Sequence, residues 1–467
     1  MNSCEVGKFE RVIEADVCIG CGGCATVEPD IEMKFDSRGL LQPQGSARDS
    51  TRVSTVCPFA TSRNEDAIGA ALFGSESVSH DVRIGYYRSV YVGHVAEKAF
   101  RSRGSSGGFV TWILTELLNR GLIDGVIHVK SSIEEGVVFG YGVSTTTDEI
   151  IDGAKSKYYP VHFDKVIKKI KGDGRRYAFV GVPCFVKSIR LICEKDEVLK
   201  SQISYCIALF CGHMKSANYS QFISGQVGIL PYELRSIDFR VKDPSAPANR
   251  YSFSVDYSRN GAMLRRSLSN SKLYGVDWGL GYFKPKACDW CDDIVGELAD
   301  VSSGDAWLPG YVSDPGGNNV VVVRAKVIDE IVREGQKSAV LRFDVKTPNE
   351  VQESQEGNYR HRREGLLVRM ENAEREGTWY PEKRILCDVS NISIRRRNLY
   401  LHREYISQLS HDAFLASDKK PLLFAMRMFI PEIKYYWLSS RLVRGLAKLS
   451  IQFCRLTARI ATYWLYK

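Results

Sequence analysis

The sequence contains no apolar run long enough to cross a membrane, no repeat at solenoid period and no low-complexity tract. A transmembrane helix needs about 20 predominantly apolar residues, so none is expected. Charged residues interrupt the first 15 positions, which therefore do not resemble a secretory signal, and we expect a cytoplasmic protein. The 467 residues are 44% hydrophobic and 25% charged, which excludes a disordered or fibrous chain and predicts two or three folded domains.

The two common nucleotide-binding motifs are also missing. No Gly-x-Gly-x-x-Gly follows a predicted strand, and no Gly-Lys-Ser/Thr loop is found. A Rossmann dinucleotide site and a P-loop are therefore disfavoured. A dinucleotide cofactor would have to be bound by a different phosphate-binding loop.

An excess of positive over negative charge is found only at one end of the chain. The net charge is +9, but residues 395–467 alone contain 14 Lys and Arg against four acidic residues, so the rest of the chain is close to neutral. No base-reading module accompanies this charge, and we expect no nucleic-acid partner.

Thirteen cysteines are the most informative residues present. In a reducing compartment they favour metal or cluster ligation over disulfides. Cys18, Cys21 and Cys24 lie two residues apart on a Gly-rich loop, and Cys57 precedes a proline. This spacing is typical of the bacterial ferredoxin type of 4Fe-4S site. Zinc or buried free thiols are the alternatives, but zinc loops rarely use three thiols in consecutive two-residue steps.

A second group of cysteines is dispersed along the sequence. Cys184 and Cys211 each follow an apolar run that predicts a strand, and Cys288 and Cys291 form a Cys-x-x-Cys pair. Open α/β sheets bind ligands at the carboxyl ends of their strands, which favours a shared site for Cys184 and Cys211. Spacing alone allows a second iron-sulfur cluster, a zinc site, a redox-active dithiol or unrelated thiols.

Hydrophobic periodicity predicts an α+β or mixed α/β fold in the central region. Strand patterns alternate with helix patterns there, and one segment has the period of two that is typical of an antiparallel strand. The predicted strands are Val90–Val95, Ile123–Val129, Tyr177–Val180, Tyr205–Phe210 and Ser252–Tyr257, and the predicted helices follow Gly108 and surround Phe185–Ile192.

A Ser-Gly loop precedes the first of these helices. Ser105, Ser106, Gly107 and Gly108 could hold a phosphate through backbone amides, hydroxyls and the helix dipole, with Arg103 nearby. Taken alone, Ser and Gly before a helix are more often an ordinary N-cap.

The order of these motifs resembles the coenzyme F420 hydrogenase/dehydrogenase beta-subunit family, which includes the 7-hydroxymethyl chlorophyll a reductases. The resemblance covers about residues 15–335. It rests on both cysteine groups, on the Ser-Gly loop, and on the motifs at 181–184, 210–213 and 297–307.

The resemblance implies an iron-sulfur flavoprotein oxidoreductase with two 4Fe-4S clusters and FAD. Cys18, Cys21, Cys24 and Cys57 would bind the first cluster, and Cys184, Cys211, Cys288 and Cys291 the second. A ferredoxin-like donor or a partner oxidoreductase subunit would exchange electrons with the clusters, and FAD would reduce a small organic substrate. Alternatives are oxidation of reduced F420, as an F420-dependent beta subunit, and a non-catalytic electron-transfer subunit.

Three further residues fall at motif positions of the family. Lys157 and Tyr158 could bind phosphate, polarise the flavin or deliver a proton, and Asp305 could act beside them. A surface lysine, a half-buried tyrosine and a turn-forming aspartate are the plain alternatives.

The expected organisation has three parts. Residues 1–75 would form a ferredoxin-like cluster domain, residues 80–370 the mixed-sheet domain for FAD and the second cluster, and residues 395–467 a basic helical tail. In residues 421–467 apolar and basic residues interleave, which favours either peripheral contact with an anionic membrane, at its inner face, or packing on the enzyme.

Overall fold

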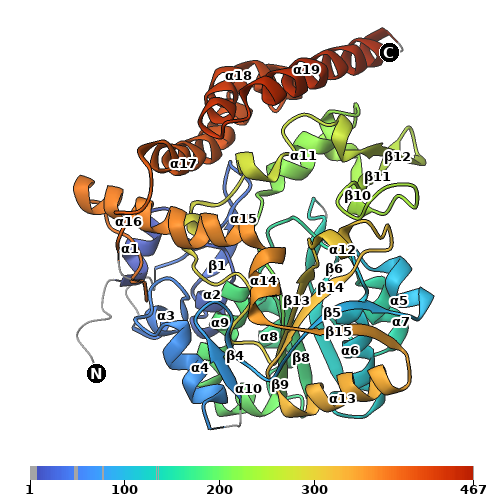
Figure 1. Ribbon diagram of the computed structural model, residues 1–467, viewed down its shortest axis with the longest axis vertical. Helices are drawn as coiled ribbons and strands as arrows, with labels where there is room; N and C mark the ends of the chain where they lie inside the picture. Colours follow the sequence, from blue (N-terminus) through green and yellow to red (C-terminus); the bar gives the residue numbers. More distant parts are fainter. Residues whose placement is uncertain are drawn as a thin grey trace.

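The computed structural model describes residues 8–46, 51–75, 78–132, 134, 136–385 and 387–465. The expected N-terminal domain is thus described from Lys8 onward, and the expected tail as far as Leu465. Figure 1 shows a large central sheet, with the N-terminal helices beside it and the last three helices stacked above the rest.

The central sheet has eight strands in the order β15-β5-β14-β13-β9-β8-β6-β7. Strands β13, β9, β8 and β6 are parallel neighbours, and the remaining pairs are antiparallel. The mixed α/β class is therefore confirmed. The strands are β5 Ser89–Val95, β6 Gly125–Ser131, β7 Phe139–Ser144, β8 Tyr177–Gly181, β9 Ile203–Leu209, β13 Val301–Asp305, β14 Asn319–Val323 and β15 Leu341–Lys346.

Helices cover both faces of this sheet because its central strands are apolar on both sides. Ala178 of β8 belongs to one core, whereas the next residue, Phe179, belongs to the other. In the amino-acid sequence, strands that are buried on both faces appear as continuous apolar runs. The helices of one face are α5 Lys98–Arg103, α6 Phe109–Asn119, α7 Thr147–Asp152 and α13 Lys326–Lys337, and those of the other are α8 Asp164–Ile170, α9 Pro183–Cys193 and α10 Glu197–Gln202.

All five predicted strands are present, with ends shifted by at most a few residues, and the two predicted helices are α6 and α9. The alternating segment is β11, which pairs antiparallel with both of its neighbours. Its three-stranded sheet lies apart from the central one and consists of β10 Leu234–Val241, β11 Ser252–Arg259 and β12 Ala262–Ser269, preceded by α11 Ala217–Gly225.

The N-terminal segment packs directly on the outer helices of the central sheet. Phe9, Val12 and Val53 share one continuous core with Phe185 and Ile189 of α9. A two-stranded hairpin and four helices make up the segment, and a second short hairpin follows it. These elements are α1 Lys8–Glu14, α2 Gly23–Val27, β1 Glu32–Phe35, β2 Leu41–Gln44, α3 Thr51–Val56, α4 Glu65–Phe73, β3 Ser79–Asp81 and β4 Gly85–Tyr87.

The chain after the central sheet is helical. No described helix is both long enough and apolar enough to span a membrane. The helices after the sheet are α14 Pro348–Ser354, α15 Glu356–Tyr359, α16 Gly365–Glu376, α17 Ile394–Leu415, α18 Pro421–Leu438 and α19 Leu442–Leu465, with a π-helical turn at Arg360–Glu364. The short helix α12 Pro309–Val312 lies earlier, between β13 and β14.

Candidate functional site

The second cysteine group converges on one small cavity. Cys184 lies in the first turn of α9, just after β8, and Cys211 lies just after the neighbouring parallel strand β9. Cys288 and Cys291 come from a short 3-10 helix at Lys286–Trp290 and the residue after it. All four side chains line the cavity. The expectation that Cys184 and Cys211 meet at the carboxyl ends of adjacent strands is confirmed.

A buried arginine borders the same cavity. Arg362 lies in the π-helical turn, and its Nη2 donates to the Gly212 carbonyl at 2.8 Å. The same nitrogen lies 3.9 Å from Cys211 Sγ. Burial raises the pKa of the Cys211 thiol to about 12, and the Arg362 guanidinium opposes this rise. Single π-helical turns within helices are frequent at functional sites. No sequence pattern indicates a role for Arg362, because it belongs to none of the motifs.

The first cysteine group is held by the Gly-rich loop. The N–H groups of Gly20 and Gly23 donate to Cys18 Sγ and Cys21 Sγ, both at 3.4 Å. Gly20 has a φ of +74°, a conformation that favours glycine and aims the amide at the sulfur. Cys24 and Cys57 complete the group, since each interacts electrostatically with Cys21. Burial raises the pKa of the Cys57 thiol to about 12.

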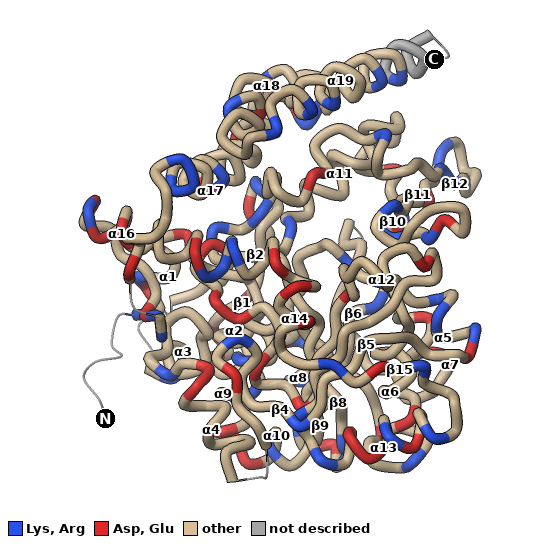
Figure 2. The backbone as a smooth tube through the Cα atoms, viewed as in Figure 1, with Lys and Arg blue, Asp and Glu red and all other residues tan. Residues whose placement is uncertain are grey.

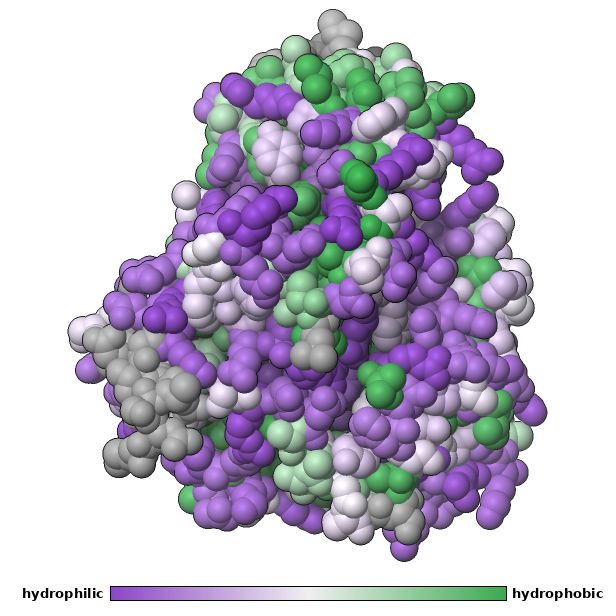
Figure 3. All heavy atoms as spheres, turned by 60° about the vertical axis from the view of Figure 1, so that its left-hand side comes forward, coloured by the Kyte–Doolittle hydropathy of each residue, from purple (hydrophilic) through white to green (hydrophobic). Residues whose placement is uncertain are grey.

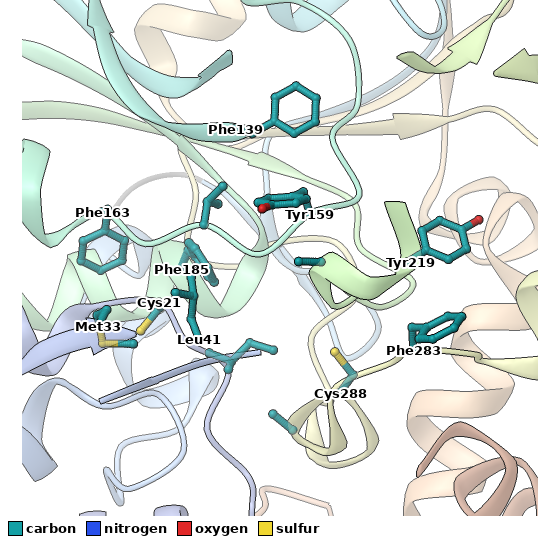
Figure 4. Close-up of a cluster of buried hydrophobic side chains, with 14 of the residues drawn as sticks. Cys21, Met33, Leu41, Phe139, Tyr159, Phe163, Phe185, Tyr219, Phe283 and Cys288 are labelled. Atoms are coloured by element: carbon teal, nitrogen blue, oxygen red, sulfur yellow. The ribbon is translucent and has the colours of Figure 1, made fainter. Parts of the chain in front are cut away.

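The two cysteine groups are neighbours. Ile19 and Phe59, which flank cysteines of the first group, also line the cavity of the second. Cys21 of the first group lies close enough to Cys184 to raise its pKa further, beyond the larger effect of burial. Figure 4 shows Cys21 and Cys288 in one cluster of buried hydrophobic side chains, with Phe185 near Cys21. Among the described residues no three His, Cys, Asp or Glu side chains are placed to bind a single metal ion.

A larger cavity of about 600 Å³ opens beyond the second cysteine group. Cys211 and Met214 line both cavities, so this group directly adjoins the larger space. Its volume lies within the range of about 300–1,000 Å³ that is usual for cofactor and ligand pockets.

Three residues of the Ser-Gly loop line the large cavity: Ser105, Ser106 and Gly108. The Ser105 hydroxyl accepts from the Ser156 N–H at 2.9 Å, and Ser106 Oγ donates to the Asn318 carbonyl at 2.7 Å. Gly108 has a φ of +88° and immediately precedes α6, whose N-terminus therefore borders the cavity.

The fourth loop residue, Gly107, and the nearby Arg103 lie outside the cavity lining. A Cβ on Gly107 would meet the Asn319 Oδ1 at 2.7 Å, so this glycine permits close packing against β14. Arg103 forms an exposed ion pair with Asp152 at 2.9 Å instead of reaching the cavity. A cofactor contact by Arg103 remains a prediction that would require its side chain to leave Asp152.

Lys157, Tyr158 and Asp305 all line the large cavity. The Lys157 ammonium donates to the carbonyls of Gly153 and Ala154, and burial lowers the pKa of Lys157 to about 7. Burial raises the pKa of Tyr158.

Asp305 ends β13 and accepts from Arg240 Nη1 at 2.5 Å. Sequence reasoning missed Arg240, which stands on β10, 65 residues earlier, and meets Asp305 only through the fold.

Several polar side-chain atoms in the lining of the large cavity could still form a hydrogen bond to a ligand. Arg240 Nε, His213 Nε2 and Ser303 Oγ are buried and lack a hydrogen-bond partner within the described part of the chain. Lys155 adds positive charge to the lining, and Lys215, whose pKa burial lowers to about 7, lies there too. Buried polar atoms without partners are costly, so this set favours a bound polar, anionic ligand.

Two family models match the chain. The coenzyme F420 hydrogenase/dehydrogenase beta subunit N-term model matches residues 90–168, and the corresponding C terminus model matches residues 174–349. Together they cover more than half of the chain.

Curated relatives agree with this match. The coenzyme F420-dependent sulfite reductase of Methanocaldococcus jannaschii is 24% identical over 69% of this chain, and the match spans only about half, 47%, of that protein. The coenzyme F420 hydrogenase subunit beta of Methanococcus voltae is 24% identical over 55% of this chain and 84% of its own length. A chain in a solved F420-reducing NiFe hydrogenase complex from Methanosarcina barkeri aligns over 65% of this chain and 98% of its own, at 16% identity and a TM-score of 0.47.

Proposed function

The chain belongs to the coenzyme F420 hydrogenase/dehydrogenase beta-subunit family, and from this premise we propose that it is an iron-sulfur flavoprotein oxidoreductase with two 4Fe-4S clusters and FAD. One structural feature supports this proposal above all. Two groups of four cysteines and a cavity of about 600 Å³ adjoin one another in series, with Ile19 and Phe59 at the first junction and Cys211 at the second.

The thiol groups suit clusters better than isolated ions. Each group contributes four buried or half-buried thiols, and backbone N–H groups point at the sulfurs of Cys18, Cys21 and Cys288, each at 3.4 Å. Hydrogen bonds to the sulfurs are among the features that set cluster potentials. Bound in this series, the clusters would pass single electrons, and the flavin would exchange them singly or in pairs.

The large cavity suits FAD because both cationic and aromatic side chains line it. Lys155, Lys157 and the N-terminus of α6 would attract the diphosphate, with Ser105 beside them. Tyr158 lies 4.9 Å from Trp278 between ring centroids and presents an apolar wall.

Lys157 and Asp305 would have different roles. With a pKa lowered to about 7, Lys157 Nζ can hold or release a proton near neutral pH. Asp305 would orient the Arg240 guanidinium, leaving its unpartnered Nε for the ligand.

The series of two clusters and a flavin would exchange electrons with a different partner at each end. A ferredoxin-like protein or a partner oxidoreductase subunit would exchange electrons at the first cluster, and a small organic substrate would react at the flavin, with reduction of the substrate as the favoured direction. The names of the relatives favour a subunit role as well, since several are hydrogenase or dehydrogenase beta subunits. Oxidation of reduced F420 and non-catalytic electron transfer are therefore the alternatives.

Anaerobic purification with iron, sulfide and flavin assays tests the proposal. We expect about eight iron atoms, about eight acid-labile sulfides and one FAD per chain. Clusters without flavin would instead indicate an electron carrier, and zinc without sulfide would refute the redox function. Reoxidation of the reduced protein by candidate acceptors, F420 included, would then define the substrate.

A further inference from the structure

Helix α18 is apolar on two opposite sides. Its inner side, with Phe424 and Met428, is fully buried against Tyr274, Tyr282 and neighbouring aromatic rings. A helix packed on a protein core normally turns a polar face to water. The outer side of α18 departs from this rule.

The outer side continues from α18 onto α19. Exposed apolar side chains recur there at helical spacing, and the most exposed are Ile430 at 76% and Val443 at 83%. Figure 3 shows apolar side chains gathered at the top of the molecule, where Figure 1 places these two helices. We call this surface the tail face; its exposed apolar residues are Leu423, Met426, Ile430, Trp437, Val443 and Ile451.

Positive charge accompanies the tail face without exposed negative charge. Arg427, Lys434, Arg444 and Arg455 are exposed among its apolar residues, and Figure 2 shows Lys and Arg along both helices. Glu432 is the only acidic residue in positions 421–467. It is buried and accepts hydrogen bonds from Tyr274 at 2.5 Å and Tyr282 at 3.1 Å.

The inner side of α19 fixes the orientation of the tail face. Lys448 pairs with Asp277 at 3.0 Å, and Gln452 Nε2 donates to the Leu273 carbonyl at 2.7 Å. Leu449 and Leu456 are buried on the same side. Residues 442–459 are therefore held on the protein, and the exposed side chains cannot turn inward without breaking these contacts.

We propose that the tail face binds the surface of an anionic lipid bilayer. Interleaved Arg, Lys and large apolar residues let a helix lie in the headgroup region, where the apolar side chains enter the acyl boundary and the cations meet lipid phosphates. The exposed charges of the tail face have one sign only, which complements the anionic headgroups of a bilayer surface. The packing interpretation and the membrane interpretation thus apply to different sides of the same helices.

Vesicle flotation with the full chain tests this proposal independently of the redox function. We expect binding to vesicles of phosphatidylcholine with phosphatidylglycerol, weak binding to phosphatidylcholine alone, and loss of binding at high salt. The double variant Ile430→Asp with Val443→Asp should reduce binding at least about tenfold. Val82→Asp is the matched control, because Val82 is also 76% exposed but lies far from α18 in the sequence and outside the tail face.

Two outcomes would overturn the proposal. Either the wild-type chain fails to float with anionic vesicles, or the double variant floats as well as the control while both retain the wild-type circular dichroism. If sedimentation instead shows that the wild-type chain self-associates and the double variant is monomeric, with no vesicle binding by either, the face is an interface between copies. The visible spectrum of the same samples reports the cofactors separately, so failure here leaves the redox proposal intact.

Discussion

The two cysteine groups are assembled in different ways and lie in different electrostatic surroundings. One Gly-rich loop supplies three cysteines of the first group, whereas three segments far apart in the sequence supply the second. Lys187, which acts electrostatically on Cys57 of the first group, is paired with Glu65 at 3.1 Å. Arg362, beside the second, has no carboxylate within ion-pair distance in the described structure. A fixed positive charge stabilises the reduced cluster, so we expect the second cluster to have the higher potential.

Removing one ligand from each group tests whether they are separate sites, and this is the largest effect we expect. Cys21→Ser and Cys288→Ser should each lower the iron content by about four atoms per chain, with FAD mostly retained. The measurement is iron and flavin analysis after anaerobic purification. Cys454→Ser is the control, because this cysteine is exposed and belongs to neither group. Unchanged iron in Cys288→Ser would refute its role as a ligand.

The different construction of the two groups explains how much of each could be predicted. A loop with two-residue spacing keeps its ligands together in any fold, so the first group is visible in the sequence. The second group required β8 and β9 to be parallel neighbours, which their apolar runs indicate only indirectly. The strands themselves were predictable because each is a short apolar run bounded by turn residues.

The next prediction concerns the loop that shapes the first group. Gly20→Ala should lower the free energy of unfolding by about 1–3 kcal/mol, because a Cβ would approach Leu41 Cβ to 2.7 Å at a φ of +74°. It should also reduce iron in the first cluster while sparing the second. Thermal unfolding and iron analysis provide the measurements.

Gly121→Ala separates crowding from backbone strain in this experiment. Gly121 has a φ of +64°, but a Cβ there would meet nothing within 4 Å. We expect a cost of about 1 kcal/mol and no loss of iron. Equal effects at Gly20 and Gly121 would contradict an important role for the contact with Leu41.

Arg362 and the tail show why the remaining features could not be predicted. Arg362 reaches the second group only because the chain after β15 folds back through α14 and α15, and no local pattern encodes that path. In the tail, α18 is apolar on both sides, so its periodicity cannot tell which side packs and which is exposed.

Replacing Arg362 tests the electrostatic part of the comparison directly. Arg362→Gln should lower the potential of the second cluster by on the order of 100 mV and leave the first unchanged, because the oxidised state carries less negative charge and needs the cation less. Redox titration followed by electron paramagnetic resonance measures both clusters. Arg363→Gln provides a matched control, since this neighbour pairs with Glu297 at 3.5 Å. Equal shifts in the two variants would mean that general charge, not proximity to the sulfurs, sets the potential.

The smallest effect should come from replacing Ser188, an uncharged residue that lies beside the first cysteine group as Arg362 lies beside the second. Ser188 Oγ lies 3.8 Å from Cys21 Sγ, but its hydrogen is donated to the Val56 carbonyl at 3.0 Å and is not available to the sulfur. Ser188→Ala should therefore shift the first potential by less than about 30 mV, while loss of the bond to Val56 lowers the free energy of unfolding by about 1 kcal/mol. The same titration and a denaturant series measure the two quantities. A shift as large as that of Arg362→Gln would show that the Ser188 hydroxyl turns toward the sulfur once a cluster is bound. The electrostatic surroundings of the two cysteine groups would then differ less than we expect.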